Sequence, residues 1–281
     1  MPFAQLEDRA VLRLSGSDAG TFLQNLVTAE IEAMPDGVAR PSALLTPQGK
    51  ILFDFLVSKT EDGYRIECAA AVRDALTKRL TLYKLRAKVA VEAADELVFA
   101  VWNADETPNG AVRDERFGGA EVYRVYDAVQ AGMEPIESGA FRELRLRSGV
   151  AEAETDFPQA DMFPHDVLLD QNGGVSFKKG CYVGQEVVSR TQHRGTARRR
   201  LMLASGERHL TEGANVTSGE AKIGTLLAAS ERFGIAIVRT DKLASGLTSG
   251  APLAIDGVPV ELTIPSWAGY ALPIEAETGE A

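Results

Sequence analysis

The chain has 281 residues, of which 45% are hydrophobic and 25% are charged, and its formal net charge at pH 7 is −10. This composition is ordinary for a soluble globular protein, and the acidic excess argues against wholesale binding to nucleic acid or to an anionic membrane. The sequence has two cysteines and no apolar run near the ~20 residues of a membrane-spanning helix, which excludes a disulfide scaffold and a membrane-spanning protein. The first residues also lack the pattern of a secretory or organelle-targeting signal, so we expect a cytoplasmic protein.

The first third of the chain is predicted to contain both strands and helices. Residues 10–16 alternate apolar and polar side chains, as a half-buried strand does, and Ser17 is the predicted N-cap of a helix that follows. Residues 41–68 contain three predicted strands, separated by the turn sequences TPQGK and TEDG. The longest predicted helix lies within residues 69–89. Its predicted apolar face consists of Val72, Leu76, Leu80 and Leu85.

Strands are predicted to resume in the middle of the chain, at residues 88–94, 97–103 and 120–127. The stretch 106–119 is polar and rich in glycine, which predicts a loop. A helix closed by a glycine is predicted at 139–150. This mixture of strands and helices predicts an α+β region.

The pattern changes near residue 198 to short strands separated by Gly-rich turns. Many short strands at close spacing predict a small barrel or sandwich. We therefore expect two regions, an α+β region at 1–195 and an all-β domain at 196–281.

The two cysteines lie in different sequence settings. Cys68 ends the strand-like run YRIEC, and free cysteine is among the most buried residue types, so it is predicted to fill the core. Cys181 lies in KKGCYVGQEVVSR, residues 178–190, between lysines and glycines that do not belong in a core. A helix is predicted to begin near Val183 or Gly184, and both lysines and a helix N-terminus favour the thiolate form of a cysteine. We therefore predict an activated or ligating thiol at this position.

The polar side chains after Cys181 allow two interpretations. Glu186 and Arg190 are four residues apart with the acid first, which is the favourable order for an exposed ion pair on a helix. Alternatively, Gln185 and Glu186 together offer hydrogen bonds to the N–H and NH2 groups of a pterin-like heterocycle.

Other motifs that carry chemistry are absent from the sequence. No second cysteine forms a C-x-x-C pair with Cys181, so the sequence predicts no zinc or iron–sulfur site made by this chain alone. Walker A, G-x-S-x-G and G-x-G-x-x-G motifs are also missing. A nucleophilic pair of Cys181 with His165 or His193 lacks any cysteine-hydrolase signature.

The stretch 190–200, at the predicted junction of the two regions, is rich in arginine. Its five arginines are Arg190, Arg194, Arg198, Arg199 and Arg200. The stretch is either a solvated basic linker or an anion site, for a polyglutamate tail or for RNA phosphate. No aromatic residue interleaves with the arginines, so a stacking platform for single strands is not predicted and we do not expect nucleic acid as a partner.

The sequence KGCYVGQE followed by Arg190 resembles the K-G-C-[FY]-x-G-Q-E-x-x-x-R signature of the YgfZ-type folate-binding proteins. These proteins are relatives of the glycine-cleavage T-protein, an aminomethyltransferase. FLQNLVTAEI, LLTPQGKILFDFLV and YKLRAKV are similar to further motifs of that family. In the first of these, Asn25 replaces the usual glycine, and Ala29 and Glu30 replace an Asn-Asp pair.

The resemblance implies a ring of two interleaved α+β domains and a C-terminal β-barrel around a central opening that holds folate. It further implies a tetrahydrofolate-dependent factor for the assembly or repair of iron–sulfur clusters, mainly in [4Fe–4S] enzymes. Its partners would be folate, the assembly machinery and client enzymes, and no tightly bound metal is implied. Cys181 would be the essential thiol. Its surroundings would consist of Lys179, Gly180, Tyr182, Gly184, Gln185, Glu186 and Arg190.

Two other functions remain open. A folate-dependent aminomethyl- or methyltransferase would turn over tetrahydrofolate without needing Cys181. An accessory protein for tRNA modification would bind RNA through the arginine-rich stretch, with a strong dependence on salt.

Overall fold

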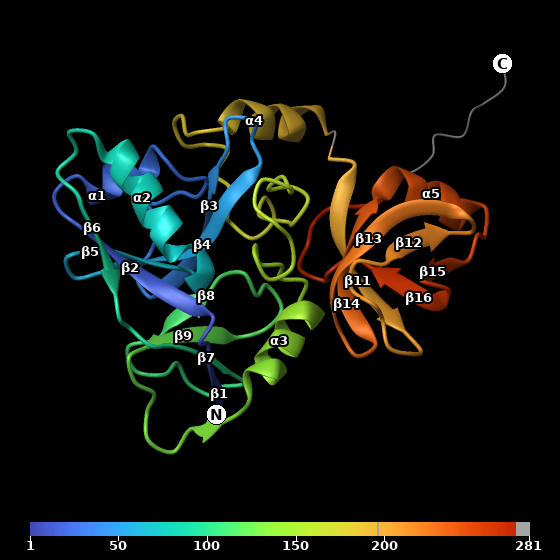
Figure 1. Cartoon of the computed structure of the whole chain (residues 1–281), viewed down its shortest axis with the longest axis horizontal. Helices are drawn as coiled ribbons and strands as arrows, with labels where there is room; N and C mark the ends of the chain where they lie inside the picture. The colour runs from blue at the N-terminus through green and yellow to red at the C-terminus, as the bar shows by residue number, and fades with distance from the viewer. Residues whose placement is uncertain (196, 274–281) are drawn as a thin grey trace.

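A ten-stranded sheet and a closed six-stranded barrel organise the computed structural model, which describes residues 1–195 and 197–273. Figure 1 shows three lobes: two contain the sheet with its helices, and the third is the barrel. The segment 148–184, between α3 and α4, runs between the lobes. The predicted boundary at residue 196 and the predicted barrel residues 274–281 lie outside the described residues.

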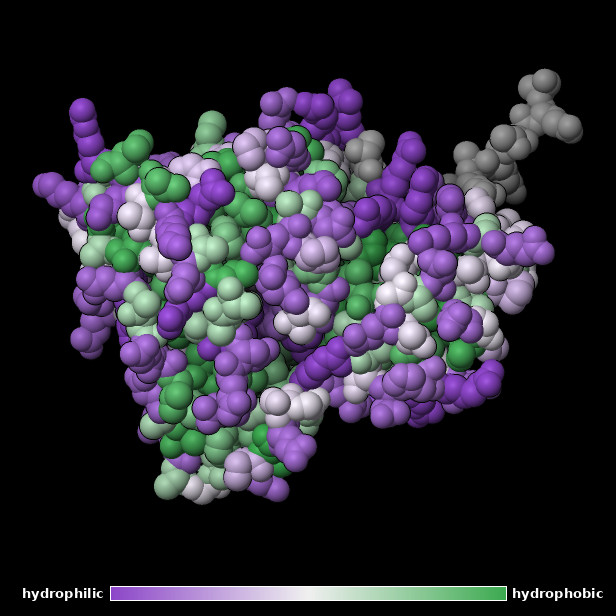
Figure 2. Space-filling model, viewed as in Figure 1, coloured by the Kyte–Doolittle hydropathy of each residue, from purple (hydrophilic) through white to green (hydrophobic). Residues whose placement is uncertain are grey.

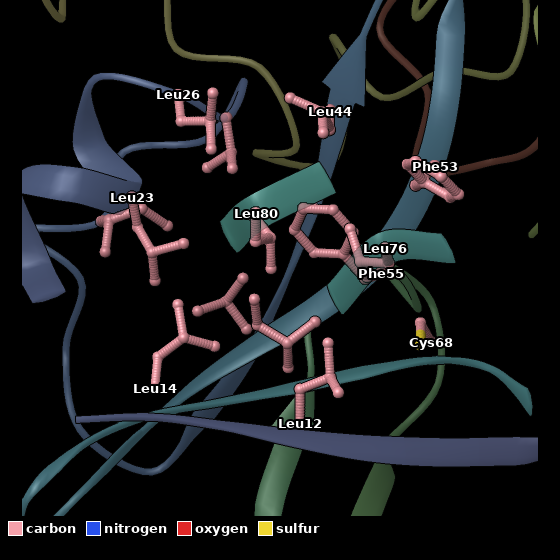
Figure 3. Packing of buried hydrophobic residues seen from close by; sticks show 14 of the residues in the cluster. Leu12, Leu14, Leu23, Leu26, Leu44, Phe53, Phe55, Cys68, Leu76 and Leu80 are labelled. Carbon is pink, nitrogen blue, oxygen red and sulfur yellow. The ribbon is translucent and has the colours of Figure 1, made fainter. Parts of the chain in front are cut away.

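The first α+β unit carries most of the sheet. Its elements are β2 (Arg9–Ser15), α1 (Ala19–Gln24), β3 (Val38–Leu45), β4 (Ile51–Thr60), β5 (Gly63–Ala69), the 3-10 turn η1 (Ala70–Val72), α2 (Arg73–Lys84) and β6 (Ala90–Ala94). Leu23 of α1 and Leu76 of α2 pack with strand residues such as Phe55 into one core (Figure 3). Every third or fourth residue of α2 is apolar, so the helix buries one face against the sheet.

The second α+β unit is interleaved with the first in sequence. Its elements are β1 (Pro2–Gln5), β7 (Val98–Trp102), β8 (Val112–Asp114), β9 (Val122–Tyr126), β10 (Glu134–Pro135) and α3 (Ser138–Arg147). The first strand of the chain, β1, pairs antiparallel with β7, beyond the whole first unit. The two units join where β3 pairs in parallel with β8, with Ala39 opposite Asp114.

The barrel closes by antiparallel pairing between its first and last strands. Its strands are β11 (Arg199–Gly206), β12 (Asn215–Ser218), β13 (Ala221–Ser230), β14 (Phe233–Arg239), β15 (Leu253–Ile255) and β16 (Val258–Thr263). β11 pairs with both β14 and β16, so the sheet closes on itself. Of the two predicted architectures, the domain is therefore a barrel and not a sandwich. A helix that was not predicted, α5 (Thr240–Thr248), packs Leu243 into the barrel core.

Hydrogen bonds connect the barrel lobe to the α+β units. The Trp267 indole N–H donates to the carbonyl of Ser148 at 2.8 Å. Arg142 of α3 donates to the carbonyl of Ala229 and to the carboxylate of Glu212, both at 2.6 Å. The three lobes therefore form one interconnected body.

The α+β prediction is confirmed, and three local predictions are wrong. The N-cap of α1 is Asp18 and not Ser17, because the helix begins at Ala19. The stretch 106–119 is not all loop, because β8 lies within it and pairs with β3. The predicted helix in 69–89 ends at Lys84, so Leu85 does not extend its buried face and is 87% exposed. No described helix is long and apolar enough to cross a membrane.

Candidate functional site

Cys181 lies on the surface, in a segment without regular secondary structure that leads into α4 (Gln185–Arg194). Gly184 is the N-cap of this helix and has a φ of +78°, a conformation that favours glycine. The structure thus confirms the predicted helix start and places an exposed thiol just ahead of it.

Lys179 anchors the segment to the first α+β unit. Its Nζ donates hydrogen bonds to the carbonyls of Val27 and Ala29, each at 2.7 Å. Burial lowers the pKa of Lys179 to about 8, although Glu30 and Glu32 favour the charged form. This lysine therefore holds the backbone beside Cys181 in place and does not project toward a ligand.

Gly184 forms a second anchor, on the turn between β3 and β4. A Cβ on Gly184 would lie 2.6 Å from the carbonyl oxygen of Thr46 and 3.1 Å from the Cα of Gly49. Gly49, at φ +81°, lies close to Val187 of α4, because a Cβ on Gly49 would lie 2.9 Å from the Val187 Cβ. The N-terminus of α4 and this turn therefore touch backbone to backbone, which only glycines permit.

Tyr182 forms a third anchor, because its side chain is buried. It packs with Leu45 and Val188 in a core shared by the sheet, α4 and the barrel. Its hydroxyl has no hydrogen-bond partner among the described residues, and burial raises its pKa to about 12. Cys181 is thus exposed although its neighbour in sequence is buried.

The remaining predicted site residues point to solvent or form surface contacts. Arg190 and Glu186 form an exposed ion pair on α4, in agreement with the first of the two interpretations. The Gln185 side-chain N–H donates to the carbonyl of Gly180 at 3.4 Å. Nothing lies within 4 Å of a Cβ placed on Gly180. No described contact joins Cys181 to a histidine, and His165 instead contacts Gln192 at 3.2 Å.

Within the described residues, none of the predicted folate surroundings lines one of the main cavities. Lys179, Tyr182 and Gly184 are used in packing, and the ion pair of α4 faces outward. The cavity between the lobes, beside Asp54 and Arg116, has a volume of about 20 Å³, and no residue of the cysteine motif lines it. Ligand pockets are usually about 300–1,000 Å³, so this cavity does not fit a pterin. Tetrahydrofolate as a cofactor stays a prediction.

A buried network of charged side chains occupies the region between the lobes. Arg124 lies between Glu67, at 3.2 Å, and Asp114, at 3.1 Å, and all three side chains are fully buried. Arg116 joins Asp114 to Glu152 of the central segment. The sequence analysis missed this network, although its signal is visible as a charged residue within the apolar strand VYRVY.

The arginine-rich stretch does not act as one free basic surface. Arg200 is buried and donates to Asp170 at 2.8 Å, and Arg199 lies 3.5 Å from Asp166. Arg190 is paired within α4. Three of its five arginines therefore already have carboxylate partners. Among the described residues, no group of three or more His, Cys, Asp or Glu side chains could hold a metal ion.

Comparisons with known proteins identify relatives over nearly the whole chain. Residues 198–270 match the family model described as the CAF17 C-terminal beta-barrel domain. The chain is 30% identical to the human mitochondrial iron–sulfur cluster assembly factor IBA57, over 94% of this chain and 84% of the human protein. The mouse IBA57 protein is 32% identical over the same shares. The IBA57 homolog of Pyricularia oryzae is 34% identical over 71% of this chain, but the match spans only 56% of that protein's length.

A solved structure shows the same fold. The glycine cleavage system aminomethyltransferase T from Bartonella henselae has a TM-score of 0.75, over 95% of this chain and 86% of that one. The identity is 15%, so this likeness shows the fold alone. It confirms the predicted arrangement of two interleaved α+β domains with a C-terminal barrel.

The names of these relatives contradict the predicted location. The human, mouse and fungal proteins are mitochondrial, so the expectation of a cytoplasmic protein is wrong. That expectation rested on the composition of the first residues. Targeting segments are separate from the folded domains, so the residues that build the fold carry no record of the compartment.

Proposed function

Because this chain belongs to the family of IBA57-type iron–sulfur cluster assembly factors, we propose that it acts in cluster assembly or repair through the Cys181 thiolate. In this proposal the thiolate is a transient ligand for an iron atom of a cluster that passes to a client enzyme. The clients are mainly [4Fe–4S] enzymes, and the cluster is cargo that the chain does not retain.

The chemistry of the chain supports a shared cluster. Thiolates are the soft ligands that iron–sulfur clusters prefer, and a cluster usually needs four of them. This chain has two cysteines, and Cys68 is fully buried. Cys181 therefore supplies one ligand, and the others must come from a partner protein that carries the cluster.

The observation that carries this proposal is the exposure of Cys181 on a firmly held segment. Lys179, Tyr182 and Gly184 fix the backbone on both sides of the thiol, while the thiol itself is exposed to solvent. A fixed and accessible thiol can meet a cluster held by another protein without rearrangement. Tetrahydrofolate stays the predicted cofactor of this role, and calorimetric titration of the wild-type protein tests whether it binds.

The test is complementation of a deletion strain with Cys181→Ser. We expect the activity and the cluster content of aconitase-type [4Fe–4S] enzymes to fall to the level of the deletion strain. The abundance and melting temperature of the variant should stay near those of the wild type, because the substituted side chain is exposed.

The matched control is Cys68→Ala, which removes the other thiol. It should lower stability, because it leaves a cavity in the core, but the protein that remains folded should support the client enzymes. Full client activity with Cys181→Ser would reject the proposed role of this thiol.

A further inference from the structure

We propose that a groove between α1 and the end of α2 is the docking site for an acidic protein that inserts an apolar side chain and brings a cluster to Cys181. The identification of the partner as a cluster carrier rests on the proposed function. The evidence for the groove itself comes from residues other than Cys181.

The groove is large enough for a protruding side chain and its neighbours. Its volume is about 560 Å³, and most of its exposed lining is apolar. Phe22 and Leu26 line it from α1 and the residues after it, and Tyr83 and Leu85 from the end of α2. Val183, two residues after Cys181, also lines it.

Two exposed apolar side chains, Tyr83 and Leu85, line this groove, and a third, Leu82, precedes them in sequence. Leu82 is 71% exposed, Tyr83 37% and Leu85 87%. These three residues are half of the large hydrophobic residues that are exposed in the described part of the chain. Figure 2 shows hydrophobic residues on the surface over the end of α2. A local concentration of exposed apolar area is typical of an interaction site.

The backbone directs Leu85 outward. α2 ends at Lys84, and Leu85 follows with a φ of +46°. A non-glycine residue in this conformation is strained and is maintained only where the surrounding structure imposes it. Leu85 therefore lines the groove from a strained backbone position, with its side chain largely in solvent.

Charge at the groove favours an acidic partner. Residues 73–88 contain six basic side chains and one acidic one, Asp74, in a chain whose net charge is −10. Two of them, Lys84 and Arg86, line the groove, and among the described residues neither forms an ion pair with a carboxylate. Lys88 instead interacts electrostatically with Asp18. The one carboxylate that lines the groove, Asp18, already accepts a hydrogen bond from the backbone N–H of Lys88 at 2.8 Å. A basic patch on an acidic protein attracts an acidic surface and orients it.

The groove lies next to the thiol. Two residues of extended chain span at most about 7 Å, so the backbone of Cys181 lies within that distance of the groove wall at Val183. Lys179 ties the same segment to the carbonyls of Val27 and Ala29, directly after the groove residue Leu26. A protein seated in the groove therefore has its surface beside the exposed sulfur.

The test uses a photoreactive benzoylphenylalanine in place of Tyr83, in the full chain in cells, with the adducts identified by mass spectrometry. We expect an adduct with an acidic, cluster-binding protein. The same residue in place of Leu247, an exposed leucine on α5 of the barrel, is the matched control and should not give this adduct. The identified protein is then purified for titration against this chain.

Two groove variants sharpen the result. Leu85→Asp, and the charge reversal Lys84→Glu with Arg86→Glu, should each weaken binding of the purified protein at least tenfold. Leu247→Asp should leave binding unchanged, and binding of the wild type should weaken as salt rises. No adduct, an adduct with a second copy of this chain, or an affinity insensitive to these variants would overturn the docking site.

The complementation assay separates this inference from the proposed function. If the groove variants support client enzymes fully while Cys181→Ser does not, the docking site fails and the role of the thiol stands. If Cys181→Ser supports them fully while the groove variants lose both partner binding and client activity, the docking site stands and the role of the thiol fails.

Discussion

The core around Cys68 and the segment around Cys181 place the same side chain in opposite environments. Cys68 lies on β5 within the packed core of the first α+β unit, where it is fully buried (Figure 3). Burial raises the pKa of its thiol to about 11, so its reactive thiolate is scarce at neutral pH. Cys181 lies on a loop segment and is exposed.

The difference between these two regions lies in what fixes the backbone. Strand pairing and packing hold Cys68, and the same packing covers its side chain. The backbone at Cys181 is instead fixed by its neighbours. Lys179 contributes hydrogen bonds, Tyr182 is buried, and Gly184 makes a close backbone contact. A cysteine between three anchors is therefore held in place and exposed at once.

The largest expected effect is a difference in alkylation rate between the two cysteines. In the native protein, a maleimide should modify Cys181 at least ~1,000-fold faster than Cys68, because Cys68 reacts only when the core opens and opening costs several kcal/mol. Peptide mapping of a timed reaction measures both rates. Similar rates for the two thiols would remove the contrast between the regions.

A smaller effect is expected from alanine at the two glycines that flank Cys181. Gly184→Ala should lower the free energy of unfolding by about 1–3 kcal/mol, because the new Cβ meets the Thr46 carbonyl at 2.6 Å and φ is positive. Gly180→Ala is the matched control and should stay within about 0.5 kcal/mol of wild type, since nothing lies near its Cβ. Urea unfolding measures both, and equal effects would show that Gly184 is not an anchor.

The smallest expected effect is a pH trend that originates in Lys179. Its pKa falls from 10.5 to about 8 on folding, so between these values the unfolded chain binds more protons at this lysine than the folded protein does. Stability from this group therefore rises with pH across that window. Lys179→Met removes the trend, so the difference in unfolding free energy between wild type and variant should grow in favour of wild type from pH 7 to pH 10.

Urea unfolding of both proteins at several pH values measures this difference. Other groups that titrate in the same window, such as Cys68, contribute equally to both proteins and cancel. If the difference in unfolding free energy between wild type and variant did not change with pH, Lys179 would not have the lowered pKa that its burial implies.

Much of the fold could be predicted from the sequence, since hydrophobic periodicity is local. The spacing of Leu76 and Leu80 predicted α2, and short strands with Gly-rich turns predicted the β-rich C-terminal domain. β8 was missed because three residues carry too little pattern, and pairing with β3, more than 70 residues away in sequence, is what makes them a strand.

The sequence by itself determined that an unusual cysteine motif precedes a helix, and that Cys68 belongs to the core. Only the tertiary structure decided what each motif residue does. Lys179 binds carbonyls that lie 152 and 150 residues earlier in the chain, and Gly184 meets a turn from the first α+β unit. The groove likewise combines α1, the end of α2 and Val183. Contacts between residues so far apart depend on how the lobes pack, and no local pattern of side chains records that packing.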